Sequence, residues 1–232
     1  MRDGARGTLA LAGSGEFLPA MAPIDSLLLN QLGEPGRVVV LPTASAPDGP
    51  GVAERWASMG VEHFAALGAS VDPVMLLTRA DAERAALAAR IAAANFVYLS
   101  GGKPRYLLDT LRTTLCWQAI ERVFTSGGIV AGCSAGAMVL GAQLIDVPLL
   151  WRTTPALNLA SGIVVMPHFD EIPRWVGGLA GRLASSITLV GIDGSTALVG
   201  RDGDWKAIGM GRVTVMRPHG RTEYRAGASV PL

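Results

Sequence analysis

Charge and long apolar runs are both scarce in this 232-residue sequence. Only 17% of the residues are charged, and 20 basic residues nearly balance 19 acidic ones, so nothing points to nucleic acid or an anionic membrane as a partner. No apolar run approaches the roughly 20 residues that span a bilayer, and the run near the N-terminus is too short for a signal peptide. We therefore expect no nucleic-acid and no membrane partner.

Cysteine and histidine are scarce as well. Cys116 and Cys133 are too few for a disulfide framework, which makes the reducing cytoplasm the expected location. The three histidines form no HExxH pattern and the cysteines no CxxC pattern, so we expect no metal site and no other cofactor.

Apolar residues, by contrast, make up half of the chain. This length and composition predict one globular domain over residues 1–232 with a well-filled core. The sequence shows no heptad repeat, and it leaves both a monomer and a homodimer open.

Short apolar runs alternate with helical stretches along most of the chain. Six runs have the continuous apolar character of strands buried on both faces: 7–13, 37–43, 70–76, 95–100, 127–132 and 162–167. Helices are predicted between them, at about 20–32, 51–67, 80–93, 104–125 and 135–142. This alternation predicts an α/β fold with a mainly parallel sheet and helices on both faces. The short apolar segments from residue 188 onward predict antiparallel strands that extend or flank this sheet.

The most informative stretch is GGIVAGCSAGAMVLGA, in which an apolar strand runs into a tight turn and a helix. Residues 132–136 read G-C-S-A-G, the G-x-S-x-G pattern of a nucleophile elbow, in which small residues let strand and helix approach each other. Gly132 and Gly136 flank Ser134 symmetrically and do not flank Cys133. We therefore predict Ser134 as the nucleophile and Cys133 as a small buried side chain. The alternative is a plain strand-to-helix turn with an incidental serine.

A serine nucleophile needs a general base, and histidine is the usual one because its pKa lies near neutrality. His168 directly follows the apolar run 162–167, at the same sheet edge as the elbow, and is the best candidate. His63 lies inside a predicted helix, which favours a structural role, and His219 lies near a terminal turn. A histidine that merely ends a strand is the alternative for His168.

The imidazole in turn needs an acidic partner. Asp146 stands in an otherwise apolar loop, where an unpaired carboxylate is costly. Asp170 lies two residues after His168. Local spacing does not decide between these two carboxylates.

Hydrogen-bond donors are also needed for the oxyanion that develops during acyl transfer. The amide of Ala135, just after the serine, is one predicted donor. A second can come from Gly101 or Gly102, which end the strand 95–100. The same glycines would also serve an ordinary strand-to-helix turn.

Together these segments resemble the serine peptidase family of dipeptidase E (aspartyl dipeptidase) and cyanophycinase, which has a class I glutamine amidotransferase-like (flavodoxin-like) α/β fold. GCSAGAMV matches the family's G-x-S-A-G-A elbow, its most specific motif, and YLSGGKPRYLLDTL is similar to its glycine loop and leucine-rich helix. LALAGSGEF, VVVLPTAS, PALNLASGIVVMPHF and GIDGSTALV are similar to further segments, so the resemblance covers most of the chain. It implies a peptidase that acts on a small peptide.

The resemblance implies Ser134 as nucleophile, His168 as base, and the amides of Gly102 and Ala135 as the oxyanion hole. The sequence IDVP matches an acidic segment of dipeptidase E that ends Asp-x-Pro, which favours Asp146 as the third catalytic residue.

Asp170 stays the alternative, because it is similar to the His-x-Glu arrangement of the amidotransferases that share the fold. Two departures from the family pattern leave the substrate open. Lys103 and Pro104 replace the usual Asn or Asp and Gln or Thr after the second glycine, in a loop that borders the substrate pocket. Gly194 replaces the usual Glu of the G-I-D-E turn, which removes one polar group near the site.

Candidates for substrate binding are Gly101, Lys103, Arg105, Arg152 and Arg174. A guanidinium group can hold a substrate carboxylate through two hydrogen bonds, although each arginine also fits an ordinary solvated position.

Two other functions compete with a serine peptidase. A glutaminase-like amidotransferase would use Cys133, whose position one residue off the elbow centre argues against it. A non-catalytic binding or scaffold protein would keep the fold while Ser134, His168 and an acid fail to converge.

Overall fold

The computed structural model describes residues 7–145, 153–172, 188–201, 203–217 and 220–232. Its largest element is an eight-stranded sheet with the order β14-β11-β10-β1-β5-β4-β2-β3. Five neighbouring strands are parallel: β1 (Thr8–Ala12), β5 (Ile129–Cys133), β4 (Phe96–Leu99), β2 (Arg37–Leu41) and β3 (Ser70–Pro73). Three antiparallel strands extend the sheet beyond β1: β10 (Thr196–Arg201), β11 (Asp204–Gly209) and β14 (Ser229–Val230). The predicted α/β fold with a mainly parallel sheet is confirmed.

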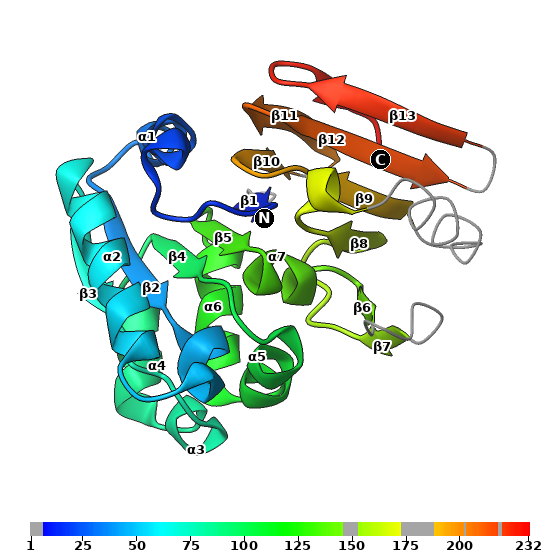
Figure 1. Cartoon of the computed structure of the whole chain (residues 1–232). Coiled ribbons are helices and arrows are strands. Elements are labelled where there is room, and N and C mark those ends of the chain that lie inside the picture. Colours follow the sequence, from blue (N-terminus) through cyan, green and yellow to red (C-terminus); the bar gives the residue numbers. More distant parts are fainter. Residues whose placement is uncertain (1–6, 146–152, 173–187, 202, 218–219) are drawn as a thin grey trace, which may run out of the picture.

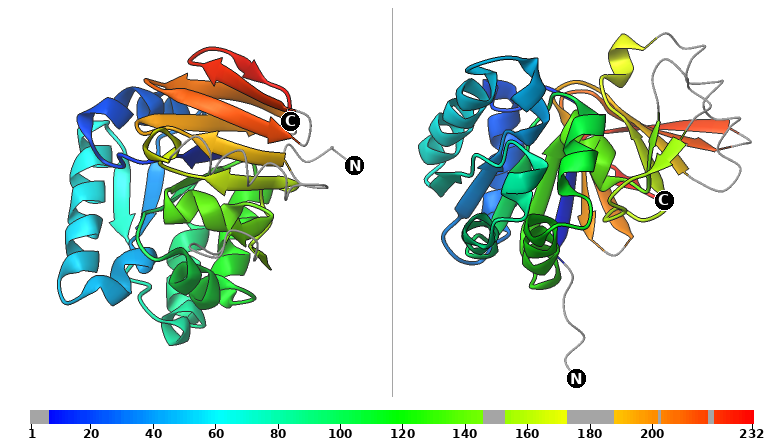
Figure 2. Two further views of the ribbon diagram at one scale, coloured as in Figure 1. Left: turned by 45° about the vertical axis from the view of Figure 1, so that its right-hand side comes forward. Right: turned by 90° about the horizontal axis from the view of Figure 1, so that it is seen from below.

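Helices cover both faces of this sheet (Figures 1 and 2). One face carries η1 (Pro19–Met21), α1 (Ala22–Asn30) and α2 (Val52–Ala66). The other carries α3 (Arg79–Ala82), α4 (Ala85–Ala92), α5 (Pro104–Leu111), α6 (Leu115–Thr125) and α7 (Ala135–Leu140). In β1, Leu9 and Leu11 pack toward the second group of helices, while Ala10 and Ala12 pack toward the first. Burial on both faces explains why β1 is a continuous apolar run.

Two predicted helices are each divided into two. In the range 104–125, Thr113 has a φ of 61°, which ends helical geometry, and the hydroxyl of Thr114 then accepts from the amide of Trp117 to start α6 (3.3 Å). In the range 80–93, Arg84 has an extended backbone between α3 and α4. Strong helix formers predict the helix in 80–93, and this signal does not detect such single-residue breaks.

A second, four-stranded sheet lies beside the first and has the order β13-β12-β9-β8 (Figure 1). Its strands are β8 (Ile163–Met166), β9 (Thr188–Ile192), β12 (Arg212–Arg217) and β13 (Gly220–Arg225). A small hairpin of β6 (Gln143–Ile145) and β7 (Thr153–Pro155) lies between α7 and β8 in sequence. Two short 3-10 helices, η2 (Thr43–Asp48) and η3 (Phe169–Glu171), follow β2 and β8.

The prediction that the strand before His168 belongs to the same sheet as the elbow is wrong. β8 pairs in parallel with β9, and both lie in the second sheet. An apolar run shows that a strand is buried on both faces, but it carries no information on which strand it pairs with. Within the part of the chain that the structure describes, we find no helix with the length and hydropathy needed to cross a membrane.

Candidate active site

The elbow lies where β5 turns into α7, and its two glycines are required by close contacts. A Cβ at Gly132 would lie 2.4 Å from the carbonyl carbon of Gly136, and a Cβ at Gly136 would lie 2.2 Å from the carbonyl oxygen of Leu99. Between them Ser134 adopts an uncommon backbone conformation with a positive φ of 50° and a ψ of −111°. Its amide donates to the carbonyl of Ala12 (3.0 Å), which fixes this strained turn against β1.

Ser134 and His168 lie within hydrogen-bond distance. Ser134 Oγ is 3.2 Å from His168 Nε2. His168 also has a positive φ, and with φ 51° and ψ 37° it lies in the left-handed region, directly before η3. Although β8 belongs to the second sheet, this turn carries the imidazole across to the elbow, so the predicted nucleophile and base meet.

The acidic partner of His168 is less well defined. His168 Nδ1 lies 3.4 Å from Glu171 Oε1, and because the Glu171 side chain is 69% exposed the contact is weak. Asp170 turns elsewhere, since its Oδ1 accepts from the amide of Gly194 (2.9 Å). Asp146, the favoured candidate, lies outside the described residues. Sequence reasoning missed Glu171, although side chains three residues apart lie on the same face of a 3-10 turn.

Gly194 and Asp170 are adjacent in space. A Cβ at Gly194 would lie 3.1 Å from Ser14 Oγ and 3.6 Å from Asp170 Oδ2. A side chain at residue 194 would therefore point toward the carboxyl group of Asp170. The departure from the G-I-D-E pattern thus leaves an acidic group at this turn, supplied by η3.

The glycine loop between β4 and α5 lies against the elbow. Gly102 has a φ of 138°, and a Cβ there would lie 2.4 Å from the carbonyl of Ala44. The amide of Lys103 donates to that same carbonyl (2.7 Å). Among the described residues, the amides of Gly102 and Ala135 have no hydrogen-bond acceptor. Neither amide is thus committed to another group in the part of the chain that the structure describes.

Other predicted residues are engaged in ordinary contacts or fall outside the described ranges. The Lys103 ammonium pairs with Asp48 at 3.3 Å, and Arg105 Nε donates to Asp109 at 2.9 Å. Arg152, Arg174 and His219 lie outside the described residues.

Cys133 is fully buried behind the elbow. Its Sγ lies 2.9 Å from Glu16 Oε2. Burial raises the pKa of the Cys133 thiol well above its ordinary value, and the charge of Glu16 and the hydrogen bond to it add to the rise. A thiol in this environment stays protonated and is a poor nucleophile.

His63 lies in α2 and contacts a buried carboxyl group far along the chain. Its Nε2 is 2.8 Å from Asp25 Oδ2, and both side chains are buried. Burial raises the pKa of Asp25 by more than the hydrogen bond to His63 and its charge lower it. His63 therefore makes a core contact beneath α1, and the structure does not bring it to Ser134.

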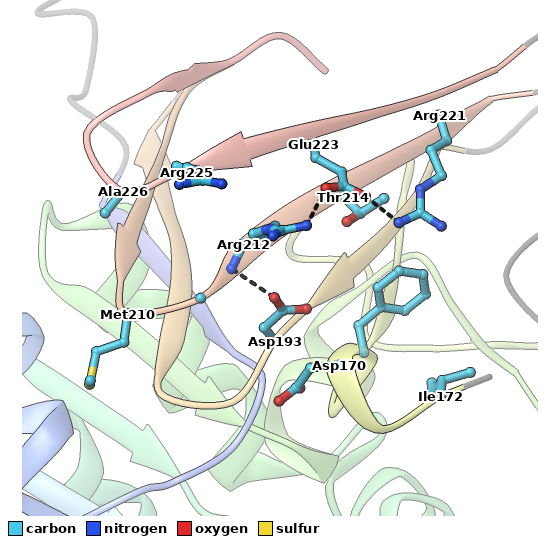
Figure 3. Close-up of a pocket in the computed structure, with 12 residues that line it drawn as sticks. Asp170, Ile172, Asp193, Met210, Arg212, Thr214, Arg221, Glu223, Arg225 and Ala226 are labelled. Carbon is cyan, nitrogen blue, oxygen red and sulfur yellow. Dashed lines mark hydrogen bonds and ion pairs between the residues drawn. The ribbon is translucent and has the colours of Figure 1, made fainter. Parts of the chain in front are cut away.

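A charged cavity of about 650 Å³ borders the turn that follows His168 (Figure 3). Its lining includes six charged side chains: Asp170, Asp193, Arg212, Arg221, Glu223 and Arg225. Glu223 accepts from Arg212 (2.6 Å) and from Arg221, while the Arg225 side chain has no partner among the described residues. Burial, with a smaller contribution from the charge of Asp170, raises the pKa of Asp193. Sequence reasoning missed this cavity because its walls come from η3, β12 and β13, which meet only in the fold.

Comparison with known proteins gives the same family as the sequence motifs. The model of peptidase family S51 matches residues 9–208. A cyanophycinase from Synechococcus elongatus is 32% identical over a 168-residue alignment, which covers 64% of this chain and 49% of that protein. An uncharacterized peptidase from Pasteurella multocida is 31% identical over a 118-residue alignment, which covers 47% of this chain and 55% of that protein. The chain thus matches about half the length of these curated relatives.

Solved structures extend the similarity to the whole chain. A crystal structure of a peptidase from an acI-B1 actinobacterium has a TM-score of 0.90 at 32% identity and covers 99% of this chain and 98% of its own. A putative peptidase E from Listeria monocytogenes has a TM-score of 0.66 at 19% identity, over 89% of this chain and 100% of its own, and shows the fold alone. Since the family model spans most of the sequence, the chain belongs to peptidase family S51.

Proposed function

We propose that this protein is a serine peptidase that hydrolyses a peptide or isopeptide bond in a small peptide through an acyl-enzyme on Ser134. The observation that carries the proposal is the 3.2 Å contact between Ser134 Oγ, at the apex of a strained elbow, and His168 Nε2. Membership of a peptidase family supports the reaction class.

The proposed reaction uses each group in turn. His168 Nε2 takes the hydroxyl proton as Ser134 Oγ attacks the substrate carbonyl carbon. The amides of Gly102 and Ala135, which have no acceptor among the described residues, donate to the oxyanion that forms. His168 then gives its proton to the leaving amine as the C–N bond breaks. Water, deprotonated by His168, finally attacks the acyl-enzyme and releases the acid and Ser134.

Asp146 is our proposed third catalytic residue, with Asp170 as the alternative. The described contact with Glu171 is long and exposed, which leaves room for a better partner of His168 Nδ1. Asp146→Asn, Asp170→Asn and Glu171→Gln can be compared directly. We expect Asp146→Asn to lose the most, by up to about 10⁴-fold in rate, because the acid holds the imidazole tautomer. A larger loss in Asp170→Asn would transfer that role to Asp170.

The substrate is proposed only as a class. Two curated relatives bear the name cyanophycinase and one structural neighbour the name peptidase E, so a dipeptide and an isopeptide both fit. The charged cavity beside η3 supports a small substrate that carries charges of both signs. A peptide library that includes Asp-X, β-Asp-Arg and unmodified X-X dipeptides would identify it.

Labelling with a fluorophosphonate probe tests the nucleophile without knowledge of the substrate. We expect covalent labelling of the wild-type protein, none in Ser134→Ala, and a strong loss in His168→Gln. Cys133→Ser is the matched control, because it removes the neighbouring thiol, leaves a hydroxyl that can donate to Glu16 Oε2, and should keep most of the labelling.

Each competing function predicts a different result in labelling experiments. Labelling of Cys133 by a glutamine-analogue affinity label would support a glutaminase. An unlabelled but folded wild-type protein would support a non-catalytic member of the fold. Equal labelling of Ser134→Ala and wild type would refute the assignment of the nucleophile.

A further inference from the structure

Glu16 is a buried acidic residue in the turn after β1, with 6% of its surface exposed. Its two carboxyl oxygens have different partners. Oε1 accepts from the amide of Gly101 at 2.7 Å, and Oε2 lies 2.9 Å from Cys133 Sγ. The single side chain thus links the turns that follow β1 and β4 to the last residue of β5, and these three parallel strands are neighbours in the sheet.

The backbone around Glu16 is held in an uncommon conformation. Gly15 has a φ of 89° and Phe17 a φ of 62°, so left-handed residues stand on both sides of Glu16. The Phe17 ring packs against Tyr98, with ring centres 5.1 Å apart, and is buried. A left-handed conformation costs an ordinary residue about 1–2 kcal/mol, and burial of the ring holds it in place. The turn therefore presents the Glu16 side chain from a rigid support.

Gly101 packs between Glu16 and Ser134. A Cβ at Gly101 would lie 2.5 Å from Glu16 Oε1 and 3.4 Å from Ser134 Cβ. The position of the carboxyl group therefore sets how closely the glycine loop approaches the serine. A shift of this loop would alter the distance between the serine and any donor that the loop supplies.

The bond to Glu16 also decides which loop amide can serve the reaction. The amide of Gly101 is already used by Glu16, whereas the next amide, that of Gly102, has no acceptor among the described residues. Consecutive peptide units in a tight turn are held in a fixed relative orientation, so fixing the first amide fixes the second. Because the Cys133 thiol stays protonated, it can donate to the other carboxyl oxygen and steady Glu16.

We propose that Glu16 is a positioning residue that holds the Gly101–Gly102 loop against Ser134, so that the Gly102 amide points at the developing oxyanion. The inference rests on the proposed serine peptidase function, and it goes beyond it by adding a residue that touches neither substrate nor the reacting atoms.

The test compares two replacements that differ in one respect. Glu16→Gln keeps an oxygen that can accept from Gly101, and its amide group can donate to the Cys133 sulfur. Glu16→Met has a similar length but offers Gly101 no comparable acceptor. Asp25→Asn is the matched control, because Asp25 is an equally buried carboxylic acid whose described partner is His63.

Two measurements are made on each protein. The first is the ¹H–¹⁵N chemical shift of the Gly101 amide, which reports its hydrogen bond independently of activity. The second is fluorophosphonate labelling over a range of probe concentrations, which separates probe binding from the maximal rate of bond formation.

In Glu16→Met we expect an upfield shift of the Gly101 amide proton. We also expect the maximal labelling rate to fall by about 10- to 100-fold, because one oxyanion donor is displaced, while probe binding changes little. We expect the maximal labelling rate of Glu16→Gln to stay within about threefold of that of wild type, because the glutamine oxygen still accepts from Gly101, although through a weaker hydrogen bond. Asp25→Asn should label at the wild-type rate. A merely structural role would instead weaken probe binding and rate together in both variants.

The inference is overturned if folded Glu16→Met labels at the wild-type maximal rate, or if its Gly101 shift is unchanged. It is also overturned if Glu16→Gln loses as much as Glu16→Met, because charge rather than loop position would then be responsible. If Glu16→Met does not fold, the inference requires Glu16→Gln to change the Gly101 shift, because a weaker acceptor replaces the carboxylate, and an unchanged shift overturns it. An unlabelled wild type refutes the proposed function, and the Gly101 shift then still decides whether Glu16 holds the loop.

Discussion

Replacing Gly136 by alanine tests whether the elbow depends on close contact between helix and strand. The new Cβ would lie 2.2 Å from the carbonyl oxygen of Leu99, whereas real Cβ atoms essentially never show contacts under 3.0 Å. From the difference between 3.0 and 2.2 Å, α7 or β4 must move by at least about 0.8 Å. Leu99 is fully buried and its strand is paired on both sides, so neither element yields easily.

The size of the effect follows from this displacement. Overpacking a dense core costs about 1–3 kcal/mol, and we expect the upper end because the obstacle is backbone rather than a flexible side chain. The first turn of α7 carries the amide of Ala135 next to Ser134, and a misplacement of about 1 Å can cost about 100-fold in rate. We therefore expect Gly136→Ala to lose about 3 kcal/mol in the free energy of unfolding and about 10- to 100-fold in fluorophosphonate labelling.

Urea unfolding followed by tryptophan fluorescence, together with the labelling rate, measures both quantities. Gly220→Ala is the matched control, because a Cβ at this glycine in β13 would have no atom of the described residues within 4 Å, its chain neighbours apart. We expect it to stay within about 0.5 kcal/mol of wild type. If Gly136→Ala unfolds and labels like Gly220→Ala, then the glycine spacing of the elbow does not serve close packing and the reasoning fails.

Two further predictions follow from the buried ionisable groups. Burial raises the pKa of Cys116 to about 11 and that of Cys133 well above its ordinary value. A disulfide reagent at pH 8 should therefore react slowly with the native protein and fast with both thiols in denaturant. One thiol that reacts fast in the native protein would contradict this. Burial also raises the pKa of Asp25 in the folded protein above that in the unfolded chain. Protonated Asp25 therefore adds to the free energy of unfolding. This contribution is complete below about pH 3.9 and is lost as the pH rises through the raised pKa of the folded protein. We therefore expect urea unfolding at a series of pH values to show the free energy of unfolding of Asp25→Asn rising relative to that of wild type across this pH range. A constant difference between the two proteins would show that the pKa of Asp25 is not raised.

The parallel core could be predicted because burial on both faces has a direct signature in the sequence. β2 and β4, for example, are runs of Val, Leu and aromatic residues whose side chains are buried on alternate faces. The pairing of β8 has no such signature. Its apolar residues would suit either sheet, and only the parallel pairing with β9 places it in the second one.

The same division between local and distant information applies to the site. The elbow could be predicted because Gly132 and Gly136 flank Ser134 within five residues. The contact of Glu16 with Gly101 joins residues 85 positions apart, and no local pattern marks it. Such a contact becomes visible only when the sheet order places β1, β5 and β4 side by side.

The elbow motif predicts backbone strain at Ser134, but the sequence conceals the strain at His168 and Phe17, because no motif marks these two residues. Ser134 and His168, which meet at 3.2 Å, have φ values of 50° and 51°, and Phe17 beside Glu16 has 62°. Each such residue costs about 1–3 kcal/mol and persists only where its surroundings over-determine it. Hydrogen bonds from the framework do so here, as in the bond from the Ser134 amide to Ala12. The stability of the sheet therefore maintains the strained turns, and the serine and histidine are brought together before any substrate binds.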